Sequence, residues 1–139
     1  MKNNDFPDNL ETYHKLAKDA GNKLRAYILS VSSGGTAIIF LALTKSELSS
    51  LSTLEKASLI IALISFVLTI IFSLFELRID AKRFFSIVTE LKKSKKSQDW
   101  SGNEKYKKMR FFLIHSSYFT LGFGILSISV FLIIKILIE

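Results

Sequence analysis

The chain of 139 residues contains no cysteine, which excludes disulfide bonds and thiolate metal sites. It also lacks an HExxH motif, a glycine-rich phosphate-binding fingerprint and any Ser, His and Asp arrangement typical of a hydrolase. Its two histidines, His14 and His115, have no evident metal-ligating partners. Internal repeats of the kind expected in transporters are absent as well. The sequence therefore predicts a protein that is not an enzyme and that carries neither a cofactor nor a metal.

Charge is scarce in three long apolar runs, which cover 26–44, 58–77 and about 117–138. Each run has about 20 residues, enough at ~1.5 Å per residue to cross the ~30 Å hydrocarbon core of a bilayer. In a soluble protein, too little polar chain would remain to cover three such helices. We therefore expect an all-α membrane protein whose third span occupies the segment 113–139.

Basic residues are unevenly distributed over the connections, and this asymmetry predicts the orientation. Five of the nineteen Lys and Arg lie in the tail 1–25 and eleven lie in the second connection, 78–112. The outer loop 45–57 holds two, and the C-terminal end holds only Lys135. The tail and the second connection are expected in the cytoplasm and the C-terminus outside, in the inner membrane of a bacterium.

The connections are predicted to be largely helical. The tail 1–25 carries an apolar stripe that predicts an amphipathic helix, either lying on the membrane surface or packed against 78–112. Ser52 and Glu55 have the spacing of a capping box. From there one helix is expected to run over Thr53–Leu91 as a rod of roughly 58 Å. Its charged end and the start of the third helix would form a basic cytoplasmic helical hairpin.

Small and hydroxylated side chains recur at helical spacing in the spans, and such residues mark where helix backbones approach in lipid. One face of the second helix carries Ser58, Ala62, Ser65, Thr69, Ser73, Glu76 and Asp80. Further stripes consist of Ser30, Gly34 and Gly35 in the first span and Ser116, Thr120, Gly124 and Ser127 in the third. All three stripes are interpreted as packing faces.

The stripe on the second helix has a second interpretation, because it ends in two carboxylates. It would line a cation pathway in an oligomer, since a ring of carboxylates favours cations. Three spans are too few to enclose such a pathway alone, so several copies would surround an axis. Alternatively, Glu76 forms an ordinary ion pair with a nearby arginine.

A compact basic cluster follows the second helix and consists of Lys92, Lys93, Lys95 and Lys96. The positive-inside bias and contact with anionic lipid headgroups account for such a cluster. The alternative is a cytosolic partner, either a regulatory protein or an anionic ligand such as a nucleotide or oligonucleotide. Trp100 would then be available to stack on a base.

The segment "FELRIDAKRFFSIVTELKKS", together with the tail helix and the first two spans, resembles the SLATT group over about Leu10–Ser94. These are small bacterial membrane proteins associated with nucleotide second-messenger and antiphage systems. The resemblance implies an oligomeric pore-forming effector that acts when a partner releases it. The alternative function is a non-conducting membrane anchor or accessory subunit that recruits a cytosolic partner through the basic hairpin.

Overall fold

The computed structural model describes residues 6–44 and 51–138, and over these residues the chain is helical, without a strand. Helix α1 covers Phe6–Thr44, α2 covers Thr53–Leu91 and α3 covers Ser101–Ile138, with a short 3-10 turn, η2, at Lys95–Ser97. Each long helix is long and apolar enough to cross a membrane. The all-α architecture with three candidate spans is thus confirmed, and it indicates a multi-pass membrane protein.

Helix α2 begins and ends where the sequence predicts. Its start was predictable because it depends on two side chains only three positions apart. The Ser52 hydroxyl accepts a hydrogen bond from the Glu55 backbone N–H at 3.3 Å, and the Glu55 carboxylate accepts one from the Ser52 N–H at 2.6 Å. This is a complete capping box. The helix then continues without a break to Leu91, so the rod predicted from the apolar spacing is present.

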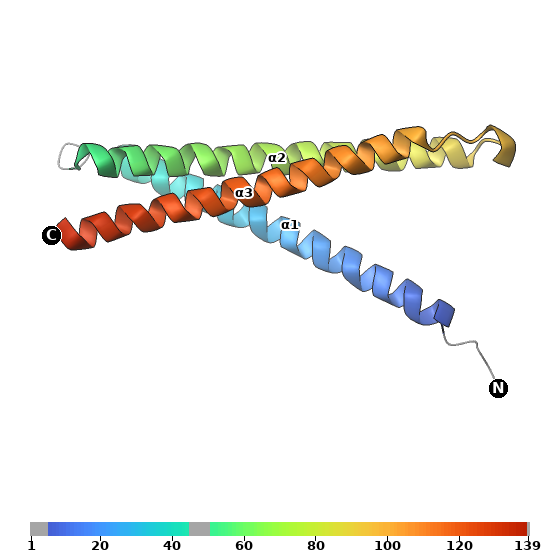
Figure 1. Cartoon of the computed structure of the whole chain (residues 1–139), viewed down its shortest axis with the longest axis horizontal. Helices are drawn as coiled ribbons and strands as arrows, with labels where there is room; N and C mark the ends of the chain where they lie inside the picture. The colour runs from blue at the N-terminus through green and yellow to red at the C-terminus, as the bar shows by residue number, and fades with distance from the viewer. Residues whose placement is uncertain (1–5, 45–50, 139) are drawn as a thin grey trace.

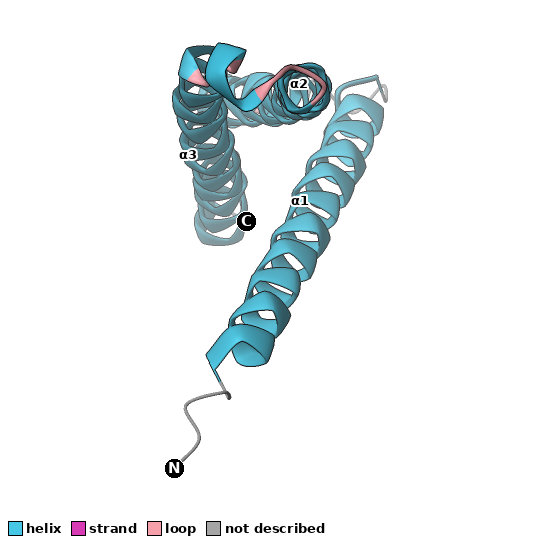
Figure 2. Cartoon of the chain, turned by 90° about the vertical axis from the view of Figure 1, so that its right-hand side faces the viewer, coloured by secondary structure: helices cyan, strands magenta, loops and turns pink. Residues whose placement is uncertain are grey.

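The three helices do not form a symmetric bundle. Helices α2 and α3 run antiparallel and pack closely, whereas α1 crosses α2 at an angle and has a smaller contact with it (Figures 1 and 2). The apolar core lies toward the end of the molecule where α1 meets α2. It is built from Ile39, Leu59, Ala62 and Phe66.

The N-terminal part of α1 diverges from the other two helices (Figure 1). The tail and the first span are one continuous helix, because no break separates them between Phe6 and Thr44. Leu24 and Tyr27, which belong to the apolar stripe that starts in the tail, are exposed, and so are Ala17 and Ala20 of the same stripe. Among the described side chains, the tail contacts 78–112 through Lys18, which lies over the Phe84 ring, and through Arg25, which pairs with Asp80.

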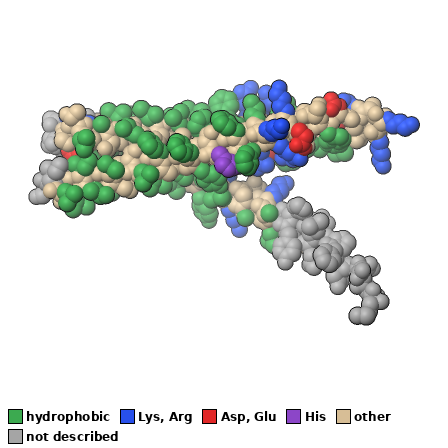
Figure 3. All heavy atoms as spheres, in the orientation of Figure 1, with side chains coloured by type: hydrophobic (Ala, Val, Ile, Leu, Met, Phe, Trp, Pro, Cys, Tyr) green, Lys and Arg blue, Asp and Glu red, His purple; other side chains and the backbone are tan. Residues whose placement is uncertain are grey.

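Apolar side chains cover much of the surface at one end of the molecule, and Lys and Arg gather at the other (Figure 3). Ile38 and Phe119, from the middle of two candidate spans, are 70% and 75% exposed. A soluble monomer rarely exposes so large an apolar surface. We call the part of the molecule formed by residues 78–112 the charged end.

Candidate functional site

One face of α2 is buried along the length of its apolar part. The face, here called the polar seam, consists of Ser58, Ala62, Ser65, Thr69, Ser73 and Glu76, all of them buried. Because these residues repeat at steps of three and four, they form one row on the helix. The row faces α1 and α3 of the same chain, so a packing role is observed for it. The lining of a pathway between copies stays a prediction.

The hydroxyls of the polar seam are satisfied partly within α2 and partly by α3. The Thr69 hydroxyl donates to the Ser65 carbonyl at 2.8 Å or pairs with the Thr120 hydroxyl, also at 2.8 Å. One turn further, the Ser73 hydroxyl lies 3.5 Å from that of Ser117. These contacts join α2 to α3 through polar groups. In lipid such contacts matter, because burial of apolar surface does not drive helices together there.

The ring of Phe66, which is buried next to the polar seam, lies between α1 and α3. A Cβ placed on Gly35 would come within 2.9 Å of this ring, and one placed on Gly124 within 3.1 Å. Both glycines therefore allow their backbones to approach opposite sides of one buried side chain. Phe66 fixes the spacing of all three helices at this level.

The predicted packing stripes of α1 and α3 are only partly used within the chain. Gly35, Thr120 and Gly124 contact α2 as described above, whereas Ser30 and Gly34 are exposed, with open space beside Gly34. Ser116 and Ser127 are half-buried. In α1 and α3 the buried serines are instead Ser32 and Ser117, which the spacing did not single out. Which serines are buried depends on where the helices cross. The spacing within one helix therefore did not identify them.

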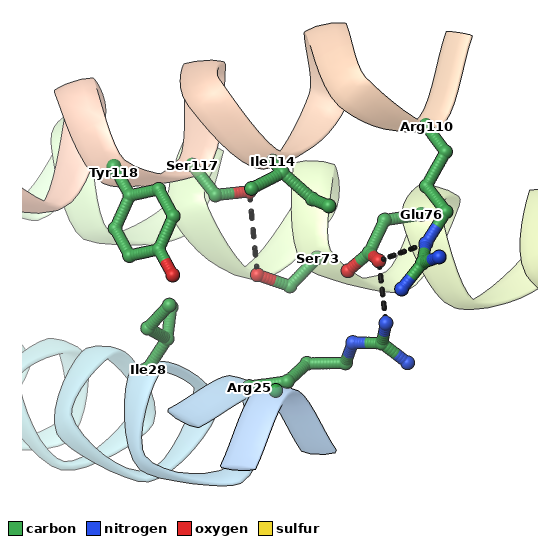
Figure 4. A pocket seen from close by; sticks show the side chains of 9 residues that line it. Arg25, Ile28, Ser73, Glu76, Arg110, Ile114, Ser117 and Tyr118 are labelled. Atoms are coloured by element: carbon green, nitrogen blue, oxygen red, sulfur yellow. Dashed lines mark hydrogen bonds and ion pairs between the residues drawn. The ribbon is translucent and has the colours of Figure 1, made fainter. Parts of the chain in front are cut away.

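The polar seam ends in an ion cluster that joins all three helices (Figure 4). The Glu76 carboxylate is only 4% exposed, and its Oε1 accepts hydrogen bonds from Arg25 Nη2 of α1 at 2.6 Å and from Arg110 Nε of α3 at 3.0 Å. Burying a carboxylate to this extent costs free energy unless a cation compensates its charge. The alternative expectation of an ion pair at Glu76 is therefore confirmed, with two arginines instead of one.

Asp80 lies one turn further along α2, and its ion pairs are longer than those of Glu76. Its carboxylate is 3.5 Å from Arg110 Nε, 3.8 Å from Arg25 Nη1 and 3.9 Å from Arg83 Nη1. Its Oδ1 is buried and accepts no hydrogen bond from the residues that the structure describes. Arg83 in turn donates from Nε to the Asn103 side-chain oxygen at 2.8 Å. We call these groups, together with Glu76, the arginine–carboxylate cluster.

A cavity of about 100 Å³ adjoins the cluster where the three helices meet. Arg25 and Ile28 line it from α1, Ser73 and Glu76 from α2, and Tyr118 is among the residues that line it from α3 (Figure 4). This space is large enough for water beside the ion pairs. Polar groups thus continue from the middle of the seam to the charged end.

The basic loop lies at the far tip of the charged end. Lys92, Lys93, Lys95 and Lys96 are exposed, and Trp100 is 38% exposed. They lie on one short connection and away from the arginine–carboxylate cluster, with which they share no ion pair in the described parts of the chain. Their surfaces are open to lipid headgroups or a partner, and binding of either stays a prediction.

Carboxylates order the connection that carries these lysines. The Glu90 carboxylate accepts from Lys93 Nζ at 2.6 Å and from the Asp99 backbone N–H at 2.8 Å. The Asp99 carboxylate accepts from the Ser101 backbone N–H at 2.9 Å, and this hydrogen bond lowers the pKa of Asp99 below its ordinary value. The lysines are therefore presented on a connection of defined shape.

No cluster of three or more His, Cys, Asp or Glu side chains suited to a metal ion occurs within the residues that the structure describes. The ring Nδ1 of His115 lies 2.9 Å from the Phe111 carbonyl of its own helix. The side chain of His14 lies outside the described residues. No family model, curated protein or solved structure matches this chain.

Proposed function

We propose that the protein is a non-enzymatic, channel-like subunit that assembles from several copies in the inner membrane of a bacterium and is gated from its charged end. The observation that carries this proposal is the polar seam, which continues through the apolar part of α2 and ends in buried charge. Purely structural packing in lipid needs small residues but no carboxylate. An intramembrane carboxylate is more often part of a pathway or a switch.

In this proposal the described arrangement is the closed form. The ring of Phe66 occupies the space between Gly35 and Gly124 beside the polar seam, and the arginine–carboxylate cluster lies at the end of the seam. Hydrophobic constrictions and ion pairs both act as gates in channels. Because α1 has the smaller contact with α2, movement of α1 would expose the seam, and several exposed seams around an axis would line a pathway.

The proposed orientation places the charged end in the cytoplasm, following the excess of Lys and Arg in 1–25 and 78–112. The cytoplasmic parts would then be the amphipathic start of α1 and the hairpin of α2 and α3. A signal received there reaches the arginine–carboxylate cluster directly, because Arg25 and Arg110 belong to these two parts. Release by a partner in antiphage defence is the role that the resemblance to the SLATT group suggests.

The assembled mass and the conductance of the reconstituted chain test the proposal. In nanodiscs we expect a mass of several copies, and in planar bilayers a current that Phe66→Ala increases. Phe119→Ala is the matched control, because this ring is 75% exposed whereas that of Phe66 is buried. A monomeric mass, or the absence of current in the wild type and in Phe66→Ala alike, would refute the proposal.

A second function is favoured by the burial of the polar seam within a single chain. A non-conducting anchor would use the spans only for insertion and would recruit a cytosolic partner through Lys92, Lys93, Lys95, Lys96 and Trp100, which are exposed. Replacing the four lysines by Gln should then abolish recovery of the partner and leave the assembled mass unchanged. Fusion reporters on both sides of the membrane control for an altered orientation.

A further inference from the structure

A second cavity, of about 410 Å³, lies beside the arginine–carboxylate cluster on the side of the charged end. It opens between α1, which contributes Lys18 and Asn22, and the other two helices, which contribute Asp80, Arg83 and Arg110. Gly21 and Arg110 line both this cavity and the smaller one described above. The larger space is of the size that small ligands occupy in proteins.

The surroundings of this cavity carry an excess of positive charge. Four cations, Lys18, Arg25, Arg83 and Arg110, surround two carboxylates, those of Glu76 and Asp80, which leaves two positive charges uncompensated within this group. Unpaired charge of one sign in a partly enclosed space attracts a counter-ion of the opposite sign. The cavity is therefore suited to an anion.

The unused hydrogen-bond donors point to the kind of anion. Arg110 uses only Nε in its ion pairs, and Arg83 uses Nε and Nη1, so the remaining Nη groups have no partner among the residues that the structure describes. The Nζ of Lys18 lies 5.6 Å from the centre of the Phe84 ring, and it forms no ion pair with a residue that the structure describes. Two guanidinium groups and an ammonium match the several oxygens of a phosphate.

We propose that this cavity binds a phosphate-bearing anion, either the headgroup of an anionic lipid or a soluble phosphate compound. The cavity residues of α2, Asp80, Arg83 and Phe84, follow the apolar run 58–77 within about two turns, which places the cavity at the level of lipid headgroups in the orientation proposed above. This site differs from the exposed loop of Lys92, Lys93, Lys95 and Lys96, where binding of lipid or of an anionic partner stays a separate prediction. The binding itself does not depend on conduction, because it involves only groups that are present in one chain.

Binding would also act on the arginine–carboxylate cluster. Arg110 is shared, so an anion that attracts its guanidinium competes with Glu76 and Asp80 for the same group. Under the proposed function this competition would loosen the contact of α3 with the cluster and favour the open form. The two proposals remain separable, since the anion is detected by binding and the channel by current.

The test uses the full chain and two probes at constant ionic strength. Inorganic pyrophosphate is titrated onto the protein in neutral detergent, and phosphatidylglycerol retained per chain is counted by native mass spectrometry from neutral nanodiscs that contain a small fraction of this lipid. Lys18→Gln combined with Arg83→Gln removes two cavity cations. Lys95→Gln combined with Lys96→Gln removes the same charge from the exposed loop and is the matched control.

We expect the cavity variant to weaken binding of at least one probe about tenfold or more, since two charge-assisted contacts are lost, and the loop variant to change it about twofold at most. The single variant Lys18→Gln should show part of this loss of affinity. It keeps the test decisive if the double variant does not fold. Preference for pyrophosphate or for the lipid identifies the source of the phosphate. Failure of the wild type to bind either probe, or equal losses in both double variants, would overturn the proposal.

Discussion

The arginine–carboxylate cluster gives the sharpest test of how the three helices are held together. In Glu76→Gln the side chain keeps its size and loses its charge, so Arg25 and Arg110 lose the partner that lies 2.6 and 3.0 Å away. Their nearest remaining carboxylate is Asp80, at 3.8 and 3.5 Å. Because Arg83 also lies 3.9 Å from Asp80, three guanidinium groups would then share one carboxylate in a partly buried space.

The size of the expected loss in the free energy of unfolding depends on how far each charged side chain is buried. Removing one member of a buried ion pair costs about 3–5 kcal/mol, because the charge that remains is no longer compensated. The Glu76 side chain is 4% exposed, whereas those of Arg25 and Arg110 are 14% and 30% exposed and can be partly hydrated. We therefore expect a loss near the lower limit, about 3 kcal/mol in the free energy of unfolding.

Reversible unfolding in mixed micelles, followed by circular dichroism, measures this loss. Glu104→Gln is the matched control, because Glu104 also pairs with a cation, Lys107 at 2.7 Å, but its side chain is 61% exposed. The control should unfold like the wild type, since exposed ion pairs contribute little. The reasoning is refuted if Glu76→Gln and Glu104→Gln unfold alike, because the cluster would then be as well hydrated as the surface.

Three further predictions concern single groups. Gly35→Ala should lower the free energy of unfolding by about 1–3 kcal/mol by overpacking the buried phenylalanine ring. Gly34→Ala, with open space beside it, should raise the free energy of unfolding by up to about 1 kcal/mol in the same titration, because alanine favours a helix more than glycine does. Thr69→Val removes the hydrogen bond to Thr120 and should cost about 0.6 kcal/mol and at most ~1.7 kcal/mol, a range that a cycle with Thr120→Val checks. Asp99, whose pKa is lowered by the Ser101 backbone N–H, should titrate below the ordinary value of about 3.9. Its stabilisation of the connection is then complete above that value and is lost as the pH falls through the lower pKa; an NMR titration that places this pKa at or above the ordinary value contradicts the assignment.

Features that depend on neighbouring residues were predictable from the sequence. The capping box of Ser52 and Glu55 and the extent of α2 follow from contacts within one helix turn and from apolar spacing. The burial of the small-residue face of α2 was also predictable, because the spacing places its members in one row. The three candidate spans follow from length and composition alone.

Features that depend on how the helices cross were not predictable. Arg25 and Arg110 are 51 and 34 residues from Glu76 in the chain, and many other basic residues were equally plausible partners. Phe66 is one of many apolar residues in its span, and only the approach of Gly35 and Gly124 distinguishes it. A pattern in one helix identifies a face, but it does not determine which residue of another helix lies opposite.

The length of α2 has a mechanical consequence. Its 39 residues extend over roughly 58 Å, so about half of the rod lies beyond a ~30 Å hydrocarbon layer. A tilt of about 10° at the membrane surface would move the free end sideways by roughly 5 Å, close to one helical turn. If a partner binds at the tip, as proposed for the lysine loop, a small tilt there would therefore be enough to move the side chains of the arginine–carboxylate cluster relative to one another.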